Sequence, residues 1–460
     1  MMLIQKIAKI IKDAGHDIYL VGGCVRDEIL KRIPNDYDFT TSATPVEIKE
    51  IFTKYGDKNI SIKDTGIKHL TLTIVVKTPI KNEKFEITTF RSDHNCDGRH
   101  ADVAIASSLK EDCSRRDFTI NALALDPFTG EIIDYFGGIE DIKRKVIRAI
   151  GTVDDRLKED WLRMMRAVRF GAQLGFKLNR ELASSIEKNA KNLRNISSER
   201  IRDEFFKILG SPSKNLRAAI YFLSYYKLLE NIIPPLQSMV GFSQRSPWHK
   251  KDVFEHSVDA MENISRFTEN PLLRFAALIH DVGKLMTRRG TEGHYRFTNH
   301  AHYSAKLTEM ICEELKMKRS DINFVKELVK SHMDVKHLKE ACNGKFNKKL
   351  FSRFIRKHYN ILNPLLMLGK SDIEIDDITE FISMVESFDF NPSLITKNKK
   401  ISSIMNGNEI MEFFDYPHPG RWIKSVKNLL IEKEIEGVLS KPEEAKEFLS
   451  SFNIGDFLVR

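Results

Sequence analysis

The hydrophobic and polar positions of this chain follow two different rhythms. Up to about residue 150, short runs of alternating apolar and polar residues predict β-strands, with helical signals between them. The expected strands are Ile18–Val21, Tyr37–Thr40, His69–Val76 and Phe85–Phe90. A glycine turn after the first strand leads into a helix from Val25. We therefore expect a small mixed sheet with helices in the first part of the chain.

From about Arg156 onward, the helical rhythm dominates. Periodic apolar positions predict helices over Glu159–Phe170 and Arg180–Leu209, followed by a break at Gly210–Ser213. Later segments are also helical, and residues 242–385 hold most of the histidines. The pattern predicts an α+β domain over residues 1–150, then mostly helical domains over residues 151–240, 241–385 and 386–460, the last of them lysine-rich.

The composition is that of a globular protein with excess positive charge. The 460 residues are 42% hydrophobic, and the net charge of +9 suits a polyanionic partner, with a solvated lysine surface as the alternative. The five cysteines are widely spaced without a CxxC pair, which predicts free thiols and a cytoplasmic location. No apolar run approaches bilayer length and the N-terminus lacks a signal-peptide core, so we expect no membrane partner.

Two acids separated by one residue mark the candidate chemistry. Asp36 and Asp38 lie on a predicted strand, so their side chains project to the same side. Carboxylates placed in this way can hold two Mg²⁺ ions, which activate a hydroxyl group and stabilise a leaving pyrophosphate. Upstream, Gly22 and Gly23 let the backbone approach a triphosphate, and Arg26 offers donors to its oxygens. Together these residues indicate nucleotidyl transfer.

Four ordered segments carry a family resemblance. They are Tyr19–Asp27 (YLVGGCVRD), Asp36–Phe39 (DYDF), Arg115–Leu123 (RRDFTINAL) and Glu159–Phe170 (EDWLRMMRAVRF). With them, the first half of the chain resembles the class II tRNA nucleotidyltransferase and bacterial poly(A) polymerase family. The resemblance implies a nucleotidyltransferase head with a polymerase-beta-like mixed sheet, followed by mostly α-helical neck, body and tail domains. It also implies selection of CTP and ATP without a nucleic-acid template.

The expected metal site lies in the head. Asp36 and Asp38 would be the catalytic Mg²⁺ ligands, because Mg²⁺ prefers a couple of carboxylates plus substrate phosphates. Glu86, on a nearby predicted strand, is a candidate third ligand. An ion pair between Glu86 and Arg91 is the equally weighted alternative.

The expected nucleotide site extends from the head into the first helices that follow it. Its residues would be Gly22, Gly23, Arg26, Arg116, Asp117, Asn121, Glu159, Asp160, Arg163, Arg166 and Arg169. Arg116 and Asp117 would touch the ribose or the triphosphate, and Asn121 would support them. A salt bridge that caps a helix is the alternative role for Asp117.

Asp160 and Arg163 would choose the base. They stand three residues apart on one face of the expected helix, where a carboxylate accepts from an exocyclic amine and a guanidinium donates to ring acceptors. Cytosine and adenine each offer an amine beside a ring nitrogen, which fits selection of CTP and ATP. Arg166 and Arg169 continue along the helix towards the phosphates. The alternative is an ion-pair ladder on the helix surface.

The segment Thr89–Val103 helps to separate the family's subtypes. It resembles the flexible loop that helps the site switch from C to A addition, although His100 stands where an arginine is usual. Thr65–Thr73 looks like the CCA-adding pattern, and the basic signature of a poly(A) polymerase is not found. We therefore expect a CCA-adding enzyme, with an A-adding enzyme or a poly(A) polymerase as the alternatives.

His280-Asp281 resembles the centre of the HD phosphohydrolase superfamily. A histidine beside an aspartate can share one divalent transition metal with ligands from other helices. The basic set would be His256, His280, Asp281 and Asp372, while His300 and His332 could hold a second metal or a phosphate; His302 is the alternative to His300. This set predicts phosphohydrolase activity, for example on 2′,3′-cyclic phosphates, with a scaffold role as the alternative.

Basic residues outside these motifs predict contacts with RNA. They are Lys188, Lys191, Arg194, Arg200 and Arg202, and in the tail Lys397, Lys399, Lys400, Arg421, Lys424 and Lys427, with Trp422 as a stacking candidate. The expected partners are the tRNA 3′ end, CTP and ATP, and no DNA. Two more distant alternatives are a regulatory protein uridylyltransferase and an RNA-binding protein with an inactive head. The segment around Glu159 argues against the first, and the intact Asp36 and Asp38 argue against the second.

Overall fold

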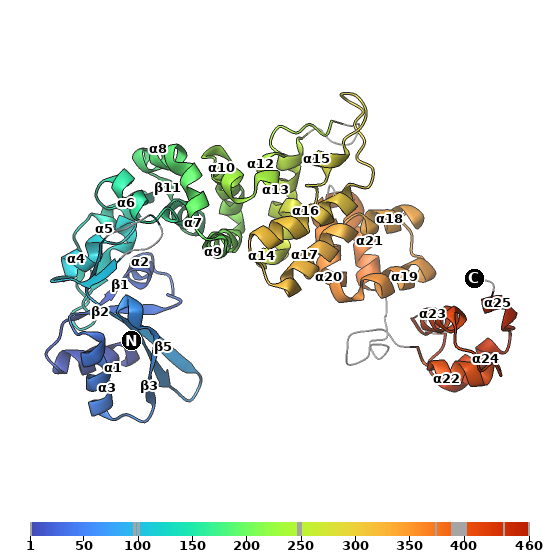
Figure 1. Ribbon diagram of the computed structural model, residues 1–460, viewed down its shortest axis with the longest axis horizontal. Coiled ribbons are helices and arrows are strands. Elements are labelled where there is room, and N and C mark those ends of the chain that lie inside the picture. Colours follow the sequence, from blue (N-terminus) through green and yellow to red (C-terminus); the bar gives the residue numbers. More distant parts are fainter. Residues whose placement is uncertain are drawn as a thin grey trace. The chain divides into compact units, whose positions relative to one another are not determined.

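The computed structural model describes residues 2–94, 98, 102–245, 251–372, 375–387, 403–435 and 438–458. The chain forms two compact units (Figure 1). Unit 1 comprises Met1–Gln237 with Glu314–Lys316, and unit 2 comprises Ser238–Glu313 with Met317–Arg460. Among the described residues, every helix is too short or too polar to span a lipid bilayer. The finer division of the chain into four domains stays a prediction.

Unit 1 begins with a mixed seven-stranded sheet, which confirms the predicted α+β head. In spatial order its strands are β3 (Ile60–Gly66), β4 (Thr71–Lys77), β5 (Asn82–Thr89), β2 (Tyr37–Thr41), β1 (Ile18–Val21), β8 (Leu123–Leu125) and β9 (Ile132–Asp134). Only β2 and β5 pair in parallel, and the other neighbours are antiparallel. A separate hairpin joins β6 (Arg91–His94) to β7 (Asp102–Ile105).

The predicted strands match the sheet, with differences at their ends. The strand expected from His69 begins at Thr71, because a 3₁₀ turn (η1, Ile67–His69) ends with Leu70 in the left-handed region. The helix expected from Val25 begins earlier, as α2 (Gly23–Ile29), because Gly22 already turns the chain with φ 82°. Short strands such as β8 and β9 could not be predicted, since three residues show no measurable alternation.

Local sequence determines the ends of the helix after β2. In α3 (Pro45–Tyr55), Thr44 and Glu47 form a reciprocal capping box at the start, and proline takes the first helical position. Gly56 ends this helix in the left-handed conformation, which glycine adopts without strain. Helix α1 (Met2–Asp13) packs against α3.

The helix expected over Glu159–Phe170 is two helices, so that prediction was wrong in detail. Helix α6 (Val153–Glu159) ends where Asp160 turns extended, with φ −155° and ψ 103°, and α7 (Arg163–Leu174) begins three residues later. The break has a local cause, because the Asp160 carboxylate accepts the backbone N–H of Leu162 at 3.1 Å. The expected stretch Arg180–Leu209 likewise contains α8 (Arg180–Asn189), a 3₁₀ turn and α9 (Ser198–Leu209). Helix α7 packs against both α9 and α10 (Ser213–Tyr225).

Unit 2 opens with a helical bundle. Its principal helices are α13 (Val253–Ile264), α14 (Pro271–Ile279), α16 (His300–Glu314), α17 (Arg319–Ser331) and α20 (Leu362–Asp372). Helix α13 packs against α14 and α20, and α14 also packs against α17. Nearly all residues of α14 are buried, so this helix forms the centre of the bundle.

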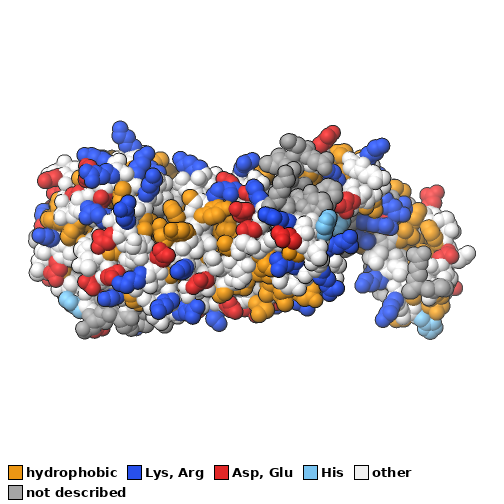
Figure 2. Space-filling model, turned by 90° about the horizontal axis from the view of Figure 1, so that it is seen from above, with side chains coloured by type: hydrophobic (Ala, Val, Ile, Leu, Met, Phe, Trp, Pro, Cys, Tyr) orange, Lys and Arg blue, Asp and Glu red, His pale blue; other side chains and the backbone are white. Residues whose placement is uncertain are grey.

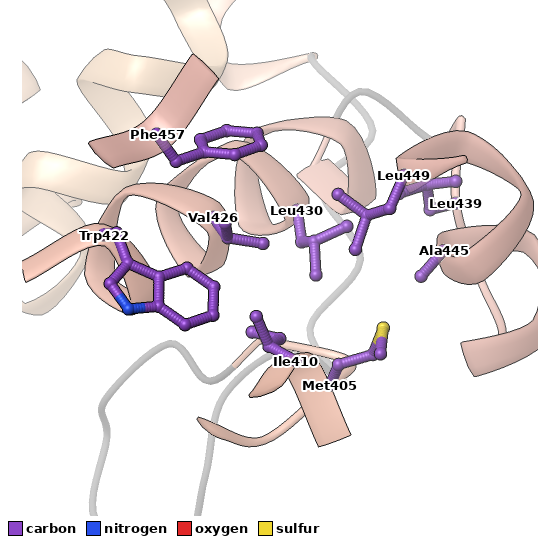
Figure 3. Packing of buried hydrophobic residues seen from close by; sticks show 9 residues of the cluster. All are labelled: Met405, Ile410, Trp422, Val426, Leu430, Leu439, Ala445, Leu449 and Phe457. Atoms are coloured by element: carbon purple, nitrogen blue, oxygen red, sulfur yellow. The ribbon is translucent and has the colours of Figure 1, made fainter. Parts of the chain in front are cut away.

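The last described residues of unit 2 form a small helical domain with its own core. It contains α22 (Gly407–Phe413), α23 (Arg421–Ile435), α24 (Pro442–Leu449) and α25 (Gly455–Leu458). Figure 3 shows the nine buried side chains of this core. Trp422 is one of them, only 4% exposed, and its indole N–H donates to the carbonyl of His418 at 3.0 Å. The prediction that Trp422 stacks on RNA was therefore wrong, because the ring is buried in the protein core and cannot reach a base.

Glu434 is an acid inside this small core. It is 2% exposed, and one carboxylate oxygen accepts the backbone N–H of Ile404 at 2.7 Å. Burial raises the pKa of the Glu434 carboxyl above its ordinary value, and the hydrogen bond from Ile404 only partly opposes that effect. Because the folded-state pKa is the higher one, the folded domain gains stability as the pH falls through that pKa and loses it as the pH rises.

Glu434→Gln should therefore stabilise the C-terminal helices at neutral pH, by about 1 kcal/mol, since it removes the charge and keeps the acceptor. Hydrogen exchange of the α23 amides in the full chain measures the effect. Protection should rise at pH 7.5, and the difference from the unmutated chain should shrink as the pH is lowered. Glu412→Gln, an exposed change on α22, serves as the control. Equal protection of both variants at pH 7.5 would contradict the prediction.

Four cysteines lie in the described part of the chain, Cys24, Cys113, Cys312 and Cys342. All four are buried free thiols, as expected from their spacing. Cys96 lies outside the described residues. Burial raises the pKa of the Cys24 thiol to about 11, so it stays protonated next to the acids of β2.

Candidate active site and metal centre

Two of the three candidate metal ligands of the head lie on neighbouring strands, and the third, Asp36, comes just before its strand instead of on it as expected. Asp38 on β2 stands directly beside Glu86 on β5 in the parallel register, and Asp36 is two residues before Asp38. Burial and the charges of Asp36 and Glu86 raise the pKa of Asp38 to about 6, while Arg116 opposes the shift. Such mutual repulsion between carboxylates favours a bound cation.

Glu86 is exposed towards this cluster. Arg91 instead donates to the carbonyl of His69 at 2.5 Å, and no ion pair joins Glu86 to Arg91, both of which the structure describes. The ion-pair alternative for Glu86 was therefore wrong. The three acids are not among the described sets of ligand atoms that lie within 4.8 Å of one another. Mg²⁺ takes one or two carboxylates and completes its shell with water and phosphate oxygens.

The Gly22–Gly23 turn passes closely over an arginine. A Cβ atom at Gly22 would lie 2.9 Å from Nη1 of Arg116, and the positive φ there also favours glycine. Arg116 itself is loosely held: its contacts to the Asp112 carboxylate and the Asn121 carbonyl are both 3.5 Å long, and its buried Nε has no hydrogen-bond partner among the described residues. A guanidinium with N–H groups that are weakly bonded, next to a glycine turn, is suited to bind triphosphate oxygens.

A buried polar chain connects this turn to the helices that follow the head. Arg26 donates to the side-chain oxygen of Asn121 at 2.7 Å, and the amide of Asn121 donates to Asp117 at 3.0 Å. Asp117 in turn accepts from Arg166 on α7 at 2.8 Å. Burial would raise the pKa of Asp117, but Arg166, Asn121 and Arg163 lower it to about 2, so the carboxylate stays ionised. The helix-capping alternative for Asp117 was therefore wrong.

Glu204 on α9 completes this chain and was missed in the sequence. It is buried and lies 3.1 Å from the Nε of Arg169 and 3.9 Å from Arg166. The guanidinium carbons of Arg26, Arg166 and Arg169 also lie 5.4, 5.3 and 4.4 Å from the ring centre of Phe170. Arg26 also pairs with Asp27 at 2.8 Å, so three arginines face three acids here. Nothing in the sequence pattern distinguishes Glu204 from a surface glutamate.

The base-reading candidates are each held by other groups. Arg163 is buried and donates to the carbonyls of Arg156 at 2.7 Å and Arg115 at 3.0 Å, and it pairs with Glu159. Asp160 instead accepts from Arg200 on α9 at 2.7 Å. Asp160 and Arg163 therefore do not share one helix face. Their partners come from other elements, so the alternative of an ion-pair ladder on one helix surface was also wrong.

Gly98 contacts the segment that carries these candidates. Its carbonyl accepts the backbone N–H of Trp161 at 3.1 Å. A Cβ atom at Gly98 would overlap the indole of Trp161, and its φ is 92°, so only glycine fits. His100 and the neighbouring residues of the predicted flexible loop lie outside the described residues.

Asp112 on α4 (Leu109–Ser114) is a second residue that the sequence pattern did not reveal. It is fully buried and accepts from Arg115 at 2.9 and 3.0 Å and from the Thr40 hydroxyl at 3.2 Å, besides its contact with Arg116. Burial would raise the pKa of Asp112, but Arg115 and Arg116 hold it below its ordinary value. Asp112 therefore fixes the two arginines against the strand that carries Asp38.

The candidate HD ligands converge in unit 2. Nε2 of His256 and Nε2 of His280 lie 2.8 and 3.0 Å from the same oxygen of Asp372, and 3.4 and 3.3 Å from one oxygen of Asp281. His256 comes from α13, the His280-Asp281 pair follows α14, and Asp372 ends α20. Their ligand atoms all lie within 4.8 Å of one another, as a single metal ion requires.

The other oxygen of Asp281 faces a second set. It lies 3.2 Å from Nε2 of His300 and 3.8 Å from Nε2 of His332, and these two Nε2 atoms are 3.1 Å apart. These three residues form a second group of ligand atoms within 4.8 Å. His302, the alternative to His300, is exposed and belongs to neither group. Asp281 can therefore bridge two ions.

Backbone carbonyls orient the histidines of both sets. The Nδ1–H of His280 donates to the carbonyl of Ala277 at 2.7 Å, and that of His332 donates to the carbonyl of Val329 at 2.7 Å. The Nδ1–H of His300 donates to the carbonyl of Phe297 at 2.9 Å. A proton held on Nδ1 leaves the Nε2 lone pair for a metal.

The charges around the HD cluster also fit a cation. Although burial disfavours its charge, Asp281 and Asp372 raise the pKa of His280 to about 10. Lys284, which the sequence pattern did not single out, lies 2.6 Å from Asp281 and 2.7 Å from the side chain of Gln244. Buried cations thus balance the two carboxylates, a role that a divalent ion can take over. Imidazole with carboxylate ligands suits transition metals better than Mg²⁺.

Most of the described basic residues expected to meet RNA have protein partners. In the first group, Lys188 pairs with Asp154, Arg194 with Asn231, Arg200 with Asp160 and Arg202 with Asp203. Lys397, Lys399 and Lys400 lie outside the described residues. RNA binding by these groups stays a prediction.

The fold and the first site resemble those of a nucleotidyltransferase head, and a helical domain with two groups of candidate metal ligands follows it. Three family models match: the Poly A polymerase head domain over residues 18–148, the Probable RNA and SrmB- binding site of polymerase A over 175–239, and the HD domain over 253–366. Through its head and HD-domain matches, the chain is similar to the tRNA nucleotidyltransferase and poly(A) polymerase family. A head and an HD domain of these kinds imply use of divalent metal ions.

Curated relatives match about half of the chain. The CCA-adding enzyme of Lactobacillus johnsonii is 46% identical over 217 residues, which is 47% of this chain and 52% of the relative. That of Bacillus subtilis is 38% identical over 241 residues, or 52% of this chain and 58% of the relative. The chain thus spans about half the length of the curated relatives it matches.

Solved structures resemble nearly the whole chain. The Bacillus stearothermophilus CCA-adding enzyme in complex with CTP has a TM-score of 0.68 at 25% identity and covers 97% of this chain and 96% of its own. The Thermotoga maritima CCA-adding enzyme complexed with tRNA-CCA has a TM-score of 0.61 at 19% identity, with 98% and 94% covered. The second likeness concerns the fold alone.

Proposed function

We propose that this chain adds C, C and A to the 3′ end of tRNA, using CTP and ATP and no nucleic-acid template. The observation that carries the proposal is the convergence of Asp36, Asp38 and Glu86 at two parallel strands next to the Gly22 turn and Arg116. The names of the relatives and of the similar structures support it.

The head would carry out the transfer. Two Mg²⁺ ions held by Asp36, Asp38 and Glu86 would activate the tRNA 3′-hydroxyl for attack on the α-phosphate and stabilise the leaving pyrophosphate. The backbone of Gly22 and Gly23 approaches the triphosphate, and Arg116 donates to it. Arg26, Asp117, Asn121, Arg166 and Arg169 hold this surface in place. Charge on the phosphates is thus met by preorganised donors.

Asp160 and Arg163 would select the base. Glu159 and two backbone carbonyls fix the Arg163 guanidinium, and Arg200 orients the Asp160 carboxylate. A fixed carboxylate and a fixed guanidinium accept from and donate to the edge shared by cytosine and adenine. Guanine and uracil present another order of donors and acceptors. With these bases, Asp160 and Arg163 would form no hydrogen bonds to the base, which would weaken binding.

Addition of labelled CTP and ATP to three tRNA transcripts tests the proposal. The transcripts end before CCA, after the first C and after CC, and Mg²⁺ is present. We expect two C residues and one A on the shortest transcript. Addition of A alone to the transcript ending in CC would make the protein an A-adding enzyme, and long A tails on any RNA would make it a poly(A) polymerase. No incorporation would refute nucleotidyl transfer altogether.

Asp112→Asn should weaken nucleotide binding without changing base choice. Loss of the charge that holds Arg115 and Arg116 together should raise KM for CTP and for ATP alike, by about tenfold, which corresponds to about 1.4 kcal/mol. Steady-state kinetics with both nucleotides measures this. Arg144→Met, which breaks an exposed pair with Glu140, is the control. A changed ratio of CTP to ATP use would show that Asp112 acts on the base instead.

The HD domain supports a second candidate function, a metal-dependent phosphohydrolase. The observation that favours it is the pair of ligand groups sharing Asp281. A divalent transition metal in each group would supply a metal-bound water for attack on a phosphate ester, such as a 2′,3′-cyclic phosphate. Lys284 would balance the Asp281 carboxylate through the oxygen that also faces His256 and His280. A cytoplasmic location, which fits the free thiols, is proposed with both functions.

A further inference from the structure

Residues 341–371 contain seven lysines and arginines and no aspartate or glutamate. Over the whole chain, 73 Lys and Arg residues face 64 Asp and Glu residues, and Figure 2 shows both kinds interspersed over the face in view. The acid-free stretch is therefore a local excess of positive charge that the overall composition does not explain.

Helix α19 (Lys348–His358) presents much of this excess to solvent. Its buried residues Phe351, Phe354 and Ile355 pack into the domain, while its basic residues stand on the other side. We define the α19 basic face as the exposed residues Lys345, Lys348, Lys349, Arg353 and Lys357. Lys345 precedes the helix, and the helix itself carries the other four of these exposed cations.

Three cations of the α19 basic face lack an acidic partner. Arg353 pairs with Glu432 at 2.9 Å and Lys357 with Asp334 at 2.7 Å. Within the described part of the chain, no ion pair engages Lys345, Lys348 or Lys349.

The two lysines at the start of α19 do not serve the stability of the helix. Lys348 and Lys349 stand in its first turn, next to the positive end of the helix dipole, where acids stabilise and cations do not. A role outside the fold, in binding an anionic partner, accounts for their position.

An exposed aromatic ring lies next to these cations. Phe346 is 54% exposed, and its ring meets Phe351 edge-on at 5.1 Å between ring centres, which holds it in place. Surfaces that bind unpaired nucleotides combine cations for the phosphates with aromatic rings on which bases stack. An anionic protein or lipid surface would leave the ring without such a role.

We propose that the α19 basic face with Phe346 is an RNA-binding surface of the HD domain. Lys345, Lys348 and Lys349 neutralise backbone phosphates, and Phe346 stacks on an unpaired base. The identity of this RNA as tRNA rests on the function proposed above. The surface lies outside both metal groups and outside the basic segments that the sequence alone indicated.

Salt-dependent binding of a tRNA transcript to the full chain, without CTP or ATP, tests the surface. In the variant Lys345→Gln/Lys348→Gln/Lys349→Gln, the plot of log affinity against log salt should become less steep by about 2 to 3, at roughly 0.9 for each phosphate that is no longer neutralised. The control variant Lys54→Gln/Lys58→Gln/Lys63→Gln removes three exposed charges from the head and should keep the slope. An unchanged slope in the first variant would overturn the proposal.

Phe346→Ala separates RNA from other polyanions. It should weaken tRNA binding about tenfold, within the range that stacking of one base on an aromatic ring supplies, and leave binding of heparin, which has no bases, unchanged. Equal effects of every variant on heparin and tRNA would reject a specific RNA surface. Because binding is measured without nucleotide addition, a chain that binds tRNA through this face yet adds no nucleotide would refute the proposed function alone.

Discussion

Asp38→Ala should abolish nucleotide addition, with a loss of at least about a thousandfold in rate. Asp38 stands between Asp36 and Glu86, so its removal takes the central ligand from both candidate metal positions. Loss of about 4 kcal/mol of transition-state stabilisation corresponds to that factor. Single-turnover addition of CTP to a transcript that ends before CCA measures the effect.

The HD domain supplies an internal control for this variant. Asp38→Ala should leave metal binding in unit 2 untouched, because every ligand there comes from other helices. Asp64→Asn, an exposed acid of β3 paired with Lys49, should keep full addition activity. Residual addition by Asp38→Ala within tenfold of the unmutated rate would show that Asp38 is not a metal ligand of the reaction.

Asp281→Asn should have the second largest effect, on the HD domain. Its two oxygens face different ligand groups, so this one change removes a ligand from each. We expect metal content to fall from two transition-metal ions per chain to one or none, and any phosphohydrolase activity to fall at least about a hundredfold, as with loss of a few kcal/mol of charge stabilisation.

Elemental analysis of the purified chain after metal loading checks this expectation directly. His302→Asn, at an exposed histidine outside both groups, is the matched control and should keep its metal. CTP addition by Asp281→Asn should be normal. Two bound ions in Asp281→Asn would contradict the bridging role.

The site residues that could be predicted are those that lie close together in the sequence or follow a known order along it. Asp36, Asp38 and the Gly22–Gly23 turn are contiguous motifs, and Asp38 lies on β2 as predicted, whereas Asp36 precedes that strand. The HD ligands were also predictable, because the His280-Asp281 pair is rare and its partners follow in order along successive helices.

What the sequence could not show is which charges meet inside the protein. Glu204 and Asp112 look like ordinary helix-surface acids until tertiary packing buries them against arginines. The helix break at Asp160 was missed because it rests on a local hydrogen bond, from the backbone N–H of Leu162 to the Asp160 carboxylate, that helical periodicity does not reveal. Trp422 was predicted to bind RNA but is buried in the core. The sequence alone does not distinguish a buried tryptophan from one that stacks on a base.

The chain of contacts from Arg26 through Asn121 and Asp117 to Arg166 limits how unit 1 can move. Breaking a buried charge pair such as Asp117–Arg166 costs several kcal/mol, far more than thermal energy. The glycine turn and the start of α7 should therefore travel as one rigid body during each round of addition. Under the proposed function, any change of shape between the addition of C and the addition of A would then arise in segments with fewer buried polar contacts. The growing 3′ end would move relative to this rigid body.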